Sequence, residues 1–152
     1  MMFRKALAAL VALVFVGYAG TALAQQKVRM QTAVPSASIY FELLKRYADR
    51  VDKMSNGRVK IEVYANSSLY KDGEEMNALQ LGAVQILAPS LAKFGPLGVR
   101  DFEVFDLPYI FDNYDELHKV TEGKVGKDLF KKLESKGIVG LAYWDNGFKD
   151  MS

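Results

Sequence analysis

Cysteine is absent from this sequence of 152 residues. No disulfide can therefore form, even in a compartment that would permit one, and no cysteine is available for lipid attachment after export. We expect the mature chain to be freely soluble.

Histidine is almost as scarce, because His118 is the only one. Nucleophilic triads need a histidine or another base beside a serine or cysteine, but His118 lies between Glu116 and Lys119 on a charged helix face. We interpret it as a solvated surface residue. The carboxylates are spread through lysine-rich segments, and neither a GxxxxGK[ST] loop nor a GxGxxG loop occurs. These absences predict no enzyme activity, no cofactor and no metal.

Long hydrophobic runs are missing apart from one near the start. Arg4 and Lys5 precede an apolar run over residues 6–16, and Ala22-Leu23-Ala24 is a small-x-small cleavage site. The run is short for a membrane span, which needs roughly 20 residues. We predict that residues 1–24 are a signal peptide cleaved after Ala24, and that the exported chain has no stable membrane insertion.

An excess of charge of one sign is missing once this leader is set aside. The whole sequence has a formal net charge of +2, and the leader contains only basic charges, Arg4 and Lys5, so residues 25–152 are formally neutral. They contain no block of lysine and arginine that would favour a nucleic acid or an anionic membrane as a partner. We predict neither.

Strand and helix patterns alternate along the rest of the chain. We expect a strand over residues 27–33, a helix capped by Ser38 and stopped at Asn56-Gly57, and a strand over 59–63 that alternates apolar and charged residues. Asp72 precedes Glu75 by three residues, which is the spacing of a capping box for a second helix. An apolar run over 83–88 is typical of a buried parallel strand.

The second half continues the alternation. Asp112 can cap a third helix, a fourth is expected over residues 125–135, and residues 138–144 are predicted to form another strand. This order predicts an α/β fold, with a mostly parallel sheet and flanking helices.

In open α/β sheets, small ligands bind beyond the carboxyl ends of the strands. This rule selects three loops, over residues 31–38, 89–93 and 145–149. Trp144 could lay its indole against the carbon skeleton of a solute. The alternative interpretation is that these are capping and turn residues, and that Trp144 belongs to the core.

Five segments carry a resemblance to a known family. Read in order, they resemble the solute-binding proteins of TRAP (tripartite ATP-independent periplasmic) transporters, the DctP-like family, over essentially all of the mature chain. The segments are Ser55-Asn56-Gly57-Arg58-Val59; Ser68-Leu69 with Asp72 and Met76; Leu79-Gln80-Leu81-Gly82-Ala83; Phe105-Asp106-Leu107-Pro108-Tyr109-Ile110-Phe111; and Tyr143-Trp144-Asp145-Asn146-Gly147-Phe148-Lys149.

The resemblance implies a two-lobed protein of the periplasmic-binding-protein type II class, of which residues 25–152 would be the first lobe in a truncated chain. Such a protein closes on an organic acid, a C4-dicarboxylate or related carboxylate, in the periplasm. It delivers the acid to a small and a large TRAP membrane subunit, driven by an ion gradient. The arginine that clamps the carboxylate in this family would lie beyond Ser152.

The resemblance also implies ligand contacts. Lys149 stands where the family often has arginine, and a compact ammonium lacks the bidentate fork of a guanidinium. By position, the ligand-binding residues would be Gln31, Thr32, Asp72, Pro89, Ser90, Lys93, Trp144, Asn146 and Lys149.

Three other interpretations stay open at this point. An ABC-type periplasmic receptor shares the export signal and the α/β lobes, and gene neighbourhood would distinguish it. An exported enzyme would need a base or metal from outside this chain. A standalone single-lobe scaffold predicts that residues 25–152 fold cooperatively by themselves.

Overall fold

A computed structural model of the protein describes residues 24–145 and 147. The predicted leader therefore lies outside the described residues, apart from Ala24. In the described part of the chain, no helix is long and apolar enough to cross a membrane.

A three-stranded parallel sheet organises the first half of the chain. Strands β1 (Gln26–Thr32), β2 (Val59–Tyr64) and β3 (Ile86–Ala88) lie in the order β2-β1-β3, so the predicted βαβαβ order is confirmed. In the central strand, Met30 is in register with Val63 on one side and with Ile86 on the other. All three strands therefore end at the same edge of the sheet.

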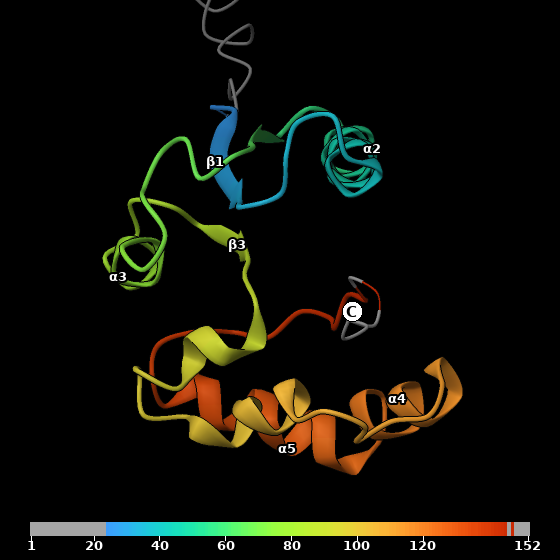
Figure 1. The fold of residues 1–152 in the computed structure, drawn as a ribbon. Helices are drawn as coiled ribbons and strands as arrows, with labels where there is room; N and C mark the ends of the chain where they lie inside the picture. Colours follow the sequence, from blue (N-terminus) through green and yellow to red (C-terminus); the bar gives the residue numbers. More distant parts are fainter. Residues whose placement is uncertain (1–23, 146, 148–152) are drawn as a thin grey trace, which may run out of the picture.

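Helices cover the two faces of this sheet (Figure 1). Helix α2 (Ile39–Met54) packs Leu44 and Ala48 against Met30 of β1 and Ile61 of β2. Leu87 of β3 instead packs toward the cluster that contains Met76 of α3 (Glu75–Gln80). Neighbouring strand residues thus face opposite layers, as the period of two requires.

A second core holds the lower part of the molecule in Figure 1 together. It is built around Phe102, which is fully buried, with Phe94 at 4.9 Å between ring centroids and Leu133 beside it. Its residues come mainly from α3, from the 3-10 helices η1 (Leu91–Phe94) and η2 (Arg100–Asp106), and from α5 (Lys124–Glu134). Helix α4 (Tyr114–Thr121) packs beside α5.

The observed helix ends match the sequence-based predictions at two places and differ from them at two. The Ser38 side chain accepts a hydrogen bond from the Phe41 N–H at 3.2 Å, and Gly57 has the left-handed φ of 76° expected of a helix stop. In contrast, Asn113 rather than Asp112 caps α4, since its Oδ1 accepts from the Glu116 N–H at 3.0 Å. Asp72 caps no helix: α3 begins after Glu74, without a side-chain cap.

The predicted strand over residues 138–144 is wrong, because this segment pairs with no strand among the described residues. Ile138 and Tyr143 of this segment instead pack in the hydrophobic cluster to which α5 contributes. The Tyr143 ring stacks on Phe130 at 4.3 Å, and its hydroxyl donates to the Gly126 carbonyl at 2.9 Å. The preceding strand is also shorter than expected: in the run over 83–88, only Ile86–Ala88 pairs.

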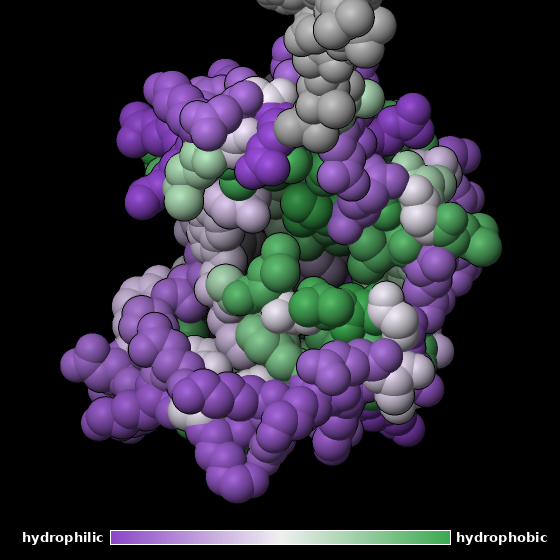
Figure 2. All heavy atoms as spheres, turned by 180° about the vertical axis from the view of Figure 1, so that it is seen from behind, coloured by the Kyte–Doolittle hydropathy of each residue, from purple (hydrophilic) through white to green (hydrophobic). Residues whose placement is uncertain are grey.

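Apolar side chains are also exposed, and Figure 2 shows hydrophobic residues gathered across the middle of one face, with hydrophilic residues above and below. Leu107, Val139 and Leu141 are exposed by 56%, 70% and 68%. Contiguous apolar surface of this kind is typical of interfaces.

Candidate functional site

The loops that follow the three strands meet at the carboxyl edge of the sheet. The parallel pairing places Thr32 of β1 beside Ala88 of β3, and the loop after β2 folds back on the end of β1 through a hydrogen bond from the Ser67 N–H to the Thr32 carbonyl at 3.1 Å. This edge is where a parallel α/β sheet binds small ligands.

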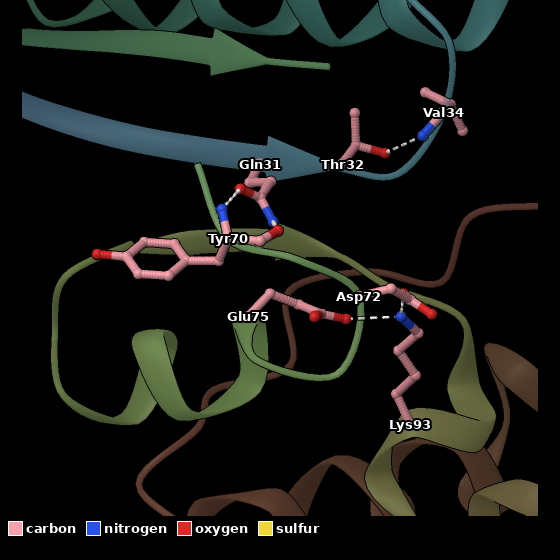
Figure 3. A network of polar contacts seen from close by, with 7 residues as sticks. All are labelled: Gln31, Thr32, Val34, Tyr70, Asp72, Glu75 and Lys93. Carbon is pink, nitrogen blue, oxygen red and sulfur yellow. Dashed lines mark hydrogen bonds and ion pairs between the residues drawn. The ribbon is translucent and has the colours of Figure 1, made fainter. Parts of the chain in front are cut away.

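Gln31 ties the loop after β2 to the central strand (Figure 3). Its side chain is only 2% exposed. The amide oxygen accepts from the backbone N–H groups of Leu69 and Tyr70 at 3.0 and 2.9 Å, and the amide nitrogen donates to the Tyr70 carbonyl at 2.9 Å. The amide is thus engaged at both ends, and it positions the segment that leads to Asp72.

Thr32 is similarly enclosed, with 3% of its surface exposed. Its hydroxyl accepts from the Val34 N–H at 3.3 Å and so turns the chain away from the end of β1. Its backbone carbonyl receives the Ser67 N–H. Thr32 therefore shapes the loops on both sides of the strand end.

Lys93 of η1 brings two carboxylates together (Figure 3). Its ammonium forms an ion pair with Asp72 in the loop after β2, and with Glu75 Oε1 in α3 at 2.6 Å. Asp72 and Glu75 lie between β2 and β3, whereas Lys93 follows β3, so the ion pairs join the segment after β2 to the segment after β3. The structure thus places two of the predicted residues, Asp72 and Lys93, in one charged cluster.

The charges of this cluster are unequally exposed. The Glu75 side chain is 7% exposed, Lys93 is 23% exposed and Asp72 is 72% exposed. Burial lowers the pKa of Lys93, while the two carboxylates in contact with it act in the opposite direction. Two carboxylates against one ammonium give the cluster one excess negative charge when all three are ionised.

Glu75 was not predicted as a site residue, since the sequence pattern suggested only a capping role. It is 5% exposed, and its Oε2 is buried without a hydrogen-bond partner among the described residues. A signal was available: Ala78 and Leu79 stand three and four residues further along the helix, so Glu75 shares their inward-facing side.

Among the described residues, the other predicted site residues take no part in the ion pairs of this cluster, although the Ser90 carbonyl accepts a hydrogen bond from the Lys93 N–H at 3.2 Å. Pro89 and Ser90 follow β3, and Ser90 precedes η1 without capping it through its side chain. Trp144 is 49% exposed and is not a core residue. Asn146 and Lys149 lie outside the described residues.

His118 is a surface residue, as expected, with 44% of its side chain exposed, but it is also paired with a carboxylate. Its Nε2 lies 2.6 Å from Asp145 Oδ2, and hydrogen bonding to this carboxylate raises the pKa of His118. The pair attaches the segment after α5 to α4, which places the neighbouring Trp144 near α4. No sequence pattern could indicate this contact, because 27 residues separate the partners.

Two open hollows contain none of the predicted residues. One, of about 440 Å³, is lined by His118 and its neighbours on α4, and the other, of about 240 Å³, lies between α2 and β2. Among the described residues, no group of three or more His, Cys, Asp or Glu side chains could hold a metal ion. The charged cluster at the sheet edge is therefore the candidate site.

This fold, a parallel α/β sheet whose polar loops gather at its carboxyl edge, is that of a lobe of a type II periplasmic binding protein, as predicted. The chain belongs to the DctP family, described as "Bacterial extracellular solute-binding protein, family 7", whose profile matches residues 30–152. The predicted family is thus confirmed. It is a family of periplasmic solute-binding transport proteins rather than of enzymes.

Three similar proteins illustrate the relationship. The chain is 69% identical over 107 residues to the C4-dicarboxylate-binding periplasmic protein DctP of Rhodobacter capsulatus, covering 70% of this chain and 32% of the relative. A TRAP periplasmic solute-binding protein from Sulfurospirillum deleyianum with bound succinate matches with a TM-score of 0.77 and 42% identity, over 82% of this chain and 40% of that one.

The sugar acid binding protein from Advenella mimigardefordensis, in complex with galactonate, matches with a TM-score of 0.78 and 34% identity, over 82% of this chain and 40% of that one. The chain therefore spans about a third of the length of the Rhodobacter relative and about two fifths of each solved structure.

Proposed function

We propose that this chain forms the first lobe of a TRAP-transporter receptor that captures an organic acid in the periplasm and delivers it to the small and large membrane subunits. The observation that carries this proposal is the position of Lys93. Its ammonium lies where the loops after β2 and β3 meet, and it is fixed there by Glu75 and Asp72. A fixed cation at the carboxyl edge of a parallel sheet suits a carboxylate ligand.

We further propose a C4-dicarboxylate as the ligand class. Identity to the dicarboxylate-binding relative is 69%, and identity to the succinate-bound structure is 42%, against 34% for the galactonate-bound protein. The two relatives with the higher identities in this comparison are thus named for dicarboxylates, although a succinate-bound protein from Shewanella oneidensis, at 32% identity, is no more similar than the galactonate-bound one. An ABC-type receptor is the alternative, and an ATPase gene beside the gene for this protein would favour it.

The proposed ligand-binding residues divide by their surroundings. Ser90, Lys93 and Trp144 are at least partly exposed and would touch the ligand, together with Asn146 and Lys149. Gln31 and Thr32 are buried and hydrogen-bonded to loop backbone, so we propose that they position the edge loops. Asp72 and Pro89 complete the set: Asp72 belongs to the binding edge through its ion pair with Lys93, and Pro89 directly follows β3.

Export is part of the same proposal, with cleavage after Ala24. Sequencing of the mature protein from the periplasmic fraction should begin at Gln25. A chain that begins at Met1 or stays with the membranes would contradict this.

Binding is tested on the complete gene product without its leader. Thermal unfolding is followed with succinate, malate, fumarate and galactonate, because a ligand that binds only the folded state stabilises it by about 2.7 kcal/mol at a concentration of 100 Kd. A rise in Tm with the dicarboxylates, without consumption of the acid, is expected. A larger rise with galactonate would refute the ligand class, and no rise with any carboxylate would refute the receptor function.

A further inference from the structure

The two carboxylates that hold Lys93 differ sharply in their access to water. The Glu75 side chain is 7% exposed, whereas the Asp72 side chain is 72% exposed. Figure 3 shows both directed at the same ammonium, Glu75 from the start of α3 and Asp72 from the loop before it. The two ion pairs therefore share one ammonium but differ in the free energy that breaking each would cost.

Separating Lys93 from Glu75 would be costly. Glu75 Oε2 is already buried without a hydrogen-bond partner in the described structure, so its other oxygen depends on the ammonium. A buried carboxylate that loses its partner keeps its full desolvation penalty. We therefore expect Lys93 to keep its ion pair with Glu75 when a ligand binds.

Separating Lys93 from Asp72 would cost little, because water can take over the hydrogen bonds of an exposed carboxylate. Ion pairs of this kind contribute little to stability. A ligand carboxylate that approaches Lys93 would also meet the like charge of Asp72. The least costly arrangement for an incoming anion is therefore one in which Asp72 swings into solvent and the ligand takes its place.

We propose that Glu75 is the permanent partner and positioning residue of Lys93, whereas Asp72 is a placeholder anion that the ligand carboxylate replaces. This inference rests on the proposed function, since it takes a carboxylate as the ligand. It assigns opposite effects to two acidic residues three positions apart. Asp72 competes with the ligand, and Glu75 holds the cation for it.

The first arm of the test measures the thermal stability of the complete, leader-free gene product without ligand. Lys93→Met should lower Tm, because it leaves the buried Glu75 carboxylate without its ion-pair partner. Glu75→Gln in the Lys93→Met background should recover most of that loss, and Asp72→Asn should recover none. If Lys93→Met does not fold, the yield of folded protein replaces Tm as the readout. Adding Glu75→Gln to Lys93→Met should then restore folded protein, and adding Asp72→Asn should not. Equal recovery by both second changes would overturn the assignment.

The second arm measures succinate affinity by calorimetry. Asp72→Asn should bind succinate roughly two- to fivefold more tightly than the wild type, the range expected for loss of an exposed competing ion pair. Glu74→Gln is the matched control: it removes the same charge from an exposed neighbour that forms no ion pair in the described structure, so its affinity should stay within about twofold of the wild type.

The outcomes separate the inference from the function on which it rests. Suppose that the wild type binds succinate. If Asp72→Asn then binds succinate more weakly, or if Glu74→Gln binds it as much more tightly as Asp72→Asn does, the placeholder role is overturned and the receptor function still stands. Absence of carboxylate binding by the wild type overturns the receptor function itself, and the placeholder role with it.

Discussion

Replacing Gln31 with leucine should loosen the loop that leads to Asp72. The change keeps the approximate size of a side chain that is 2% exposed, but it removes three hydrogen bonds to the backbone of Leu69 and Tyr70. A hydrogen bond contributes about 1 kcal/mol net, and an unsatisfied buried group costs about 1–3 kcal/mol. Since burial of leucine offsets part of the loss, we expect destabilisation of about 2–4 kcal/mol.

Two measurements check this prediction. Urea unfolding gives the free-energy change, and hydrogen exchange reports the two amides directly, because the N–H groups of Leu69 and Tyr70 both donate to the Gln31 oxygen. We expect exchange at these amides to accelerate by roughly tenfold or more, because a tenfold change corresponds to only about 1.4 kcal/mol of local opening.

Gln85→Leu is the matched control. Gln85 also makes two hydrogen bonds to backbone, with the Arg29 N–H and the Gly82 carbonyl, but it is exposed, so water can replace them. Its substitution should cost less than about 1 kcal/mol. If Gln31→Leu cost no more than Gln85→Leu, and protection at Leu69 and Tyr70 did not change, Gln31 would not anchor this loop.

Two further predictions concern the lower part of the molecule. Because the pKa of His118 is raised in the folded protein, its pairing with Asp145 stabilises the fold fully below the ordinary histidine pKa of 6.5, and this contribution is lost as pH rises through the higher folded pKa. NMR titration of the ring should show the raised pKa. Asp145→Asn should bring the pKa of His118 back toward 6.5. Phe102→Ala should lower the free energy of unfolding by about 3–5 kcal/mol, because the ring is fully buried against Phe94. Tyr109→Ala, at an 84% exposed position, should change it by less than about 0.5 kcal/mol in the same denaturation assay. A His118 ring that titrates normally, or equal effects of the two aromatic changes, would contradict these expectations.

Features governed by neighbours in sequence were predictable. Ser38 caps the start of α2 as expected, and Gly57 adopts the left-handed conformation expected after the end of this helix. The alternation of Val59, Ile61 and Val63 marks β2 correctly. Each of these depends on backbone geometry over a few residues, with a period of two or of 3.6. The family followed from short motifs in a fixed order, which also needs no tertiary information.

The candidate site was only half predictable. Asp72 and Lys93 followed from the resemblance, but their direct pairing did not, because it joins segments on either side of β3. Glu75 escaped notice because an acidic residue at a helix start is usually explained by the helix itself. Ala78 and Leu79 on the same side of α3 indicate an inward-facing position, but the pairing of the buried carboxylate with Lys93 depends on how α3 packs against the rest of the chain.

The sequence by itself determined the order of strands and helices up to β3, the helix α2 with its cap, and the family to which the chain belongs. Tertiary structure decided that residues 138–144 lie on α5 rather than in the sheet, that His118 pairs with Asp145, and that Lys93 links two loops. The physical reason is the range of the interactions. Periodicity and capping act within a few residues, whereas burial and ion pairing depend on which distant segments the folded chain brings together.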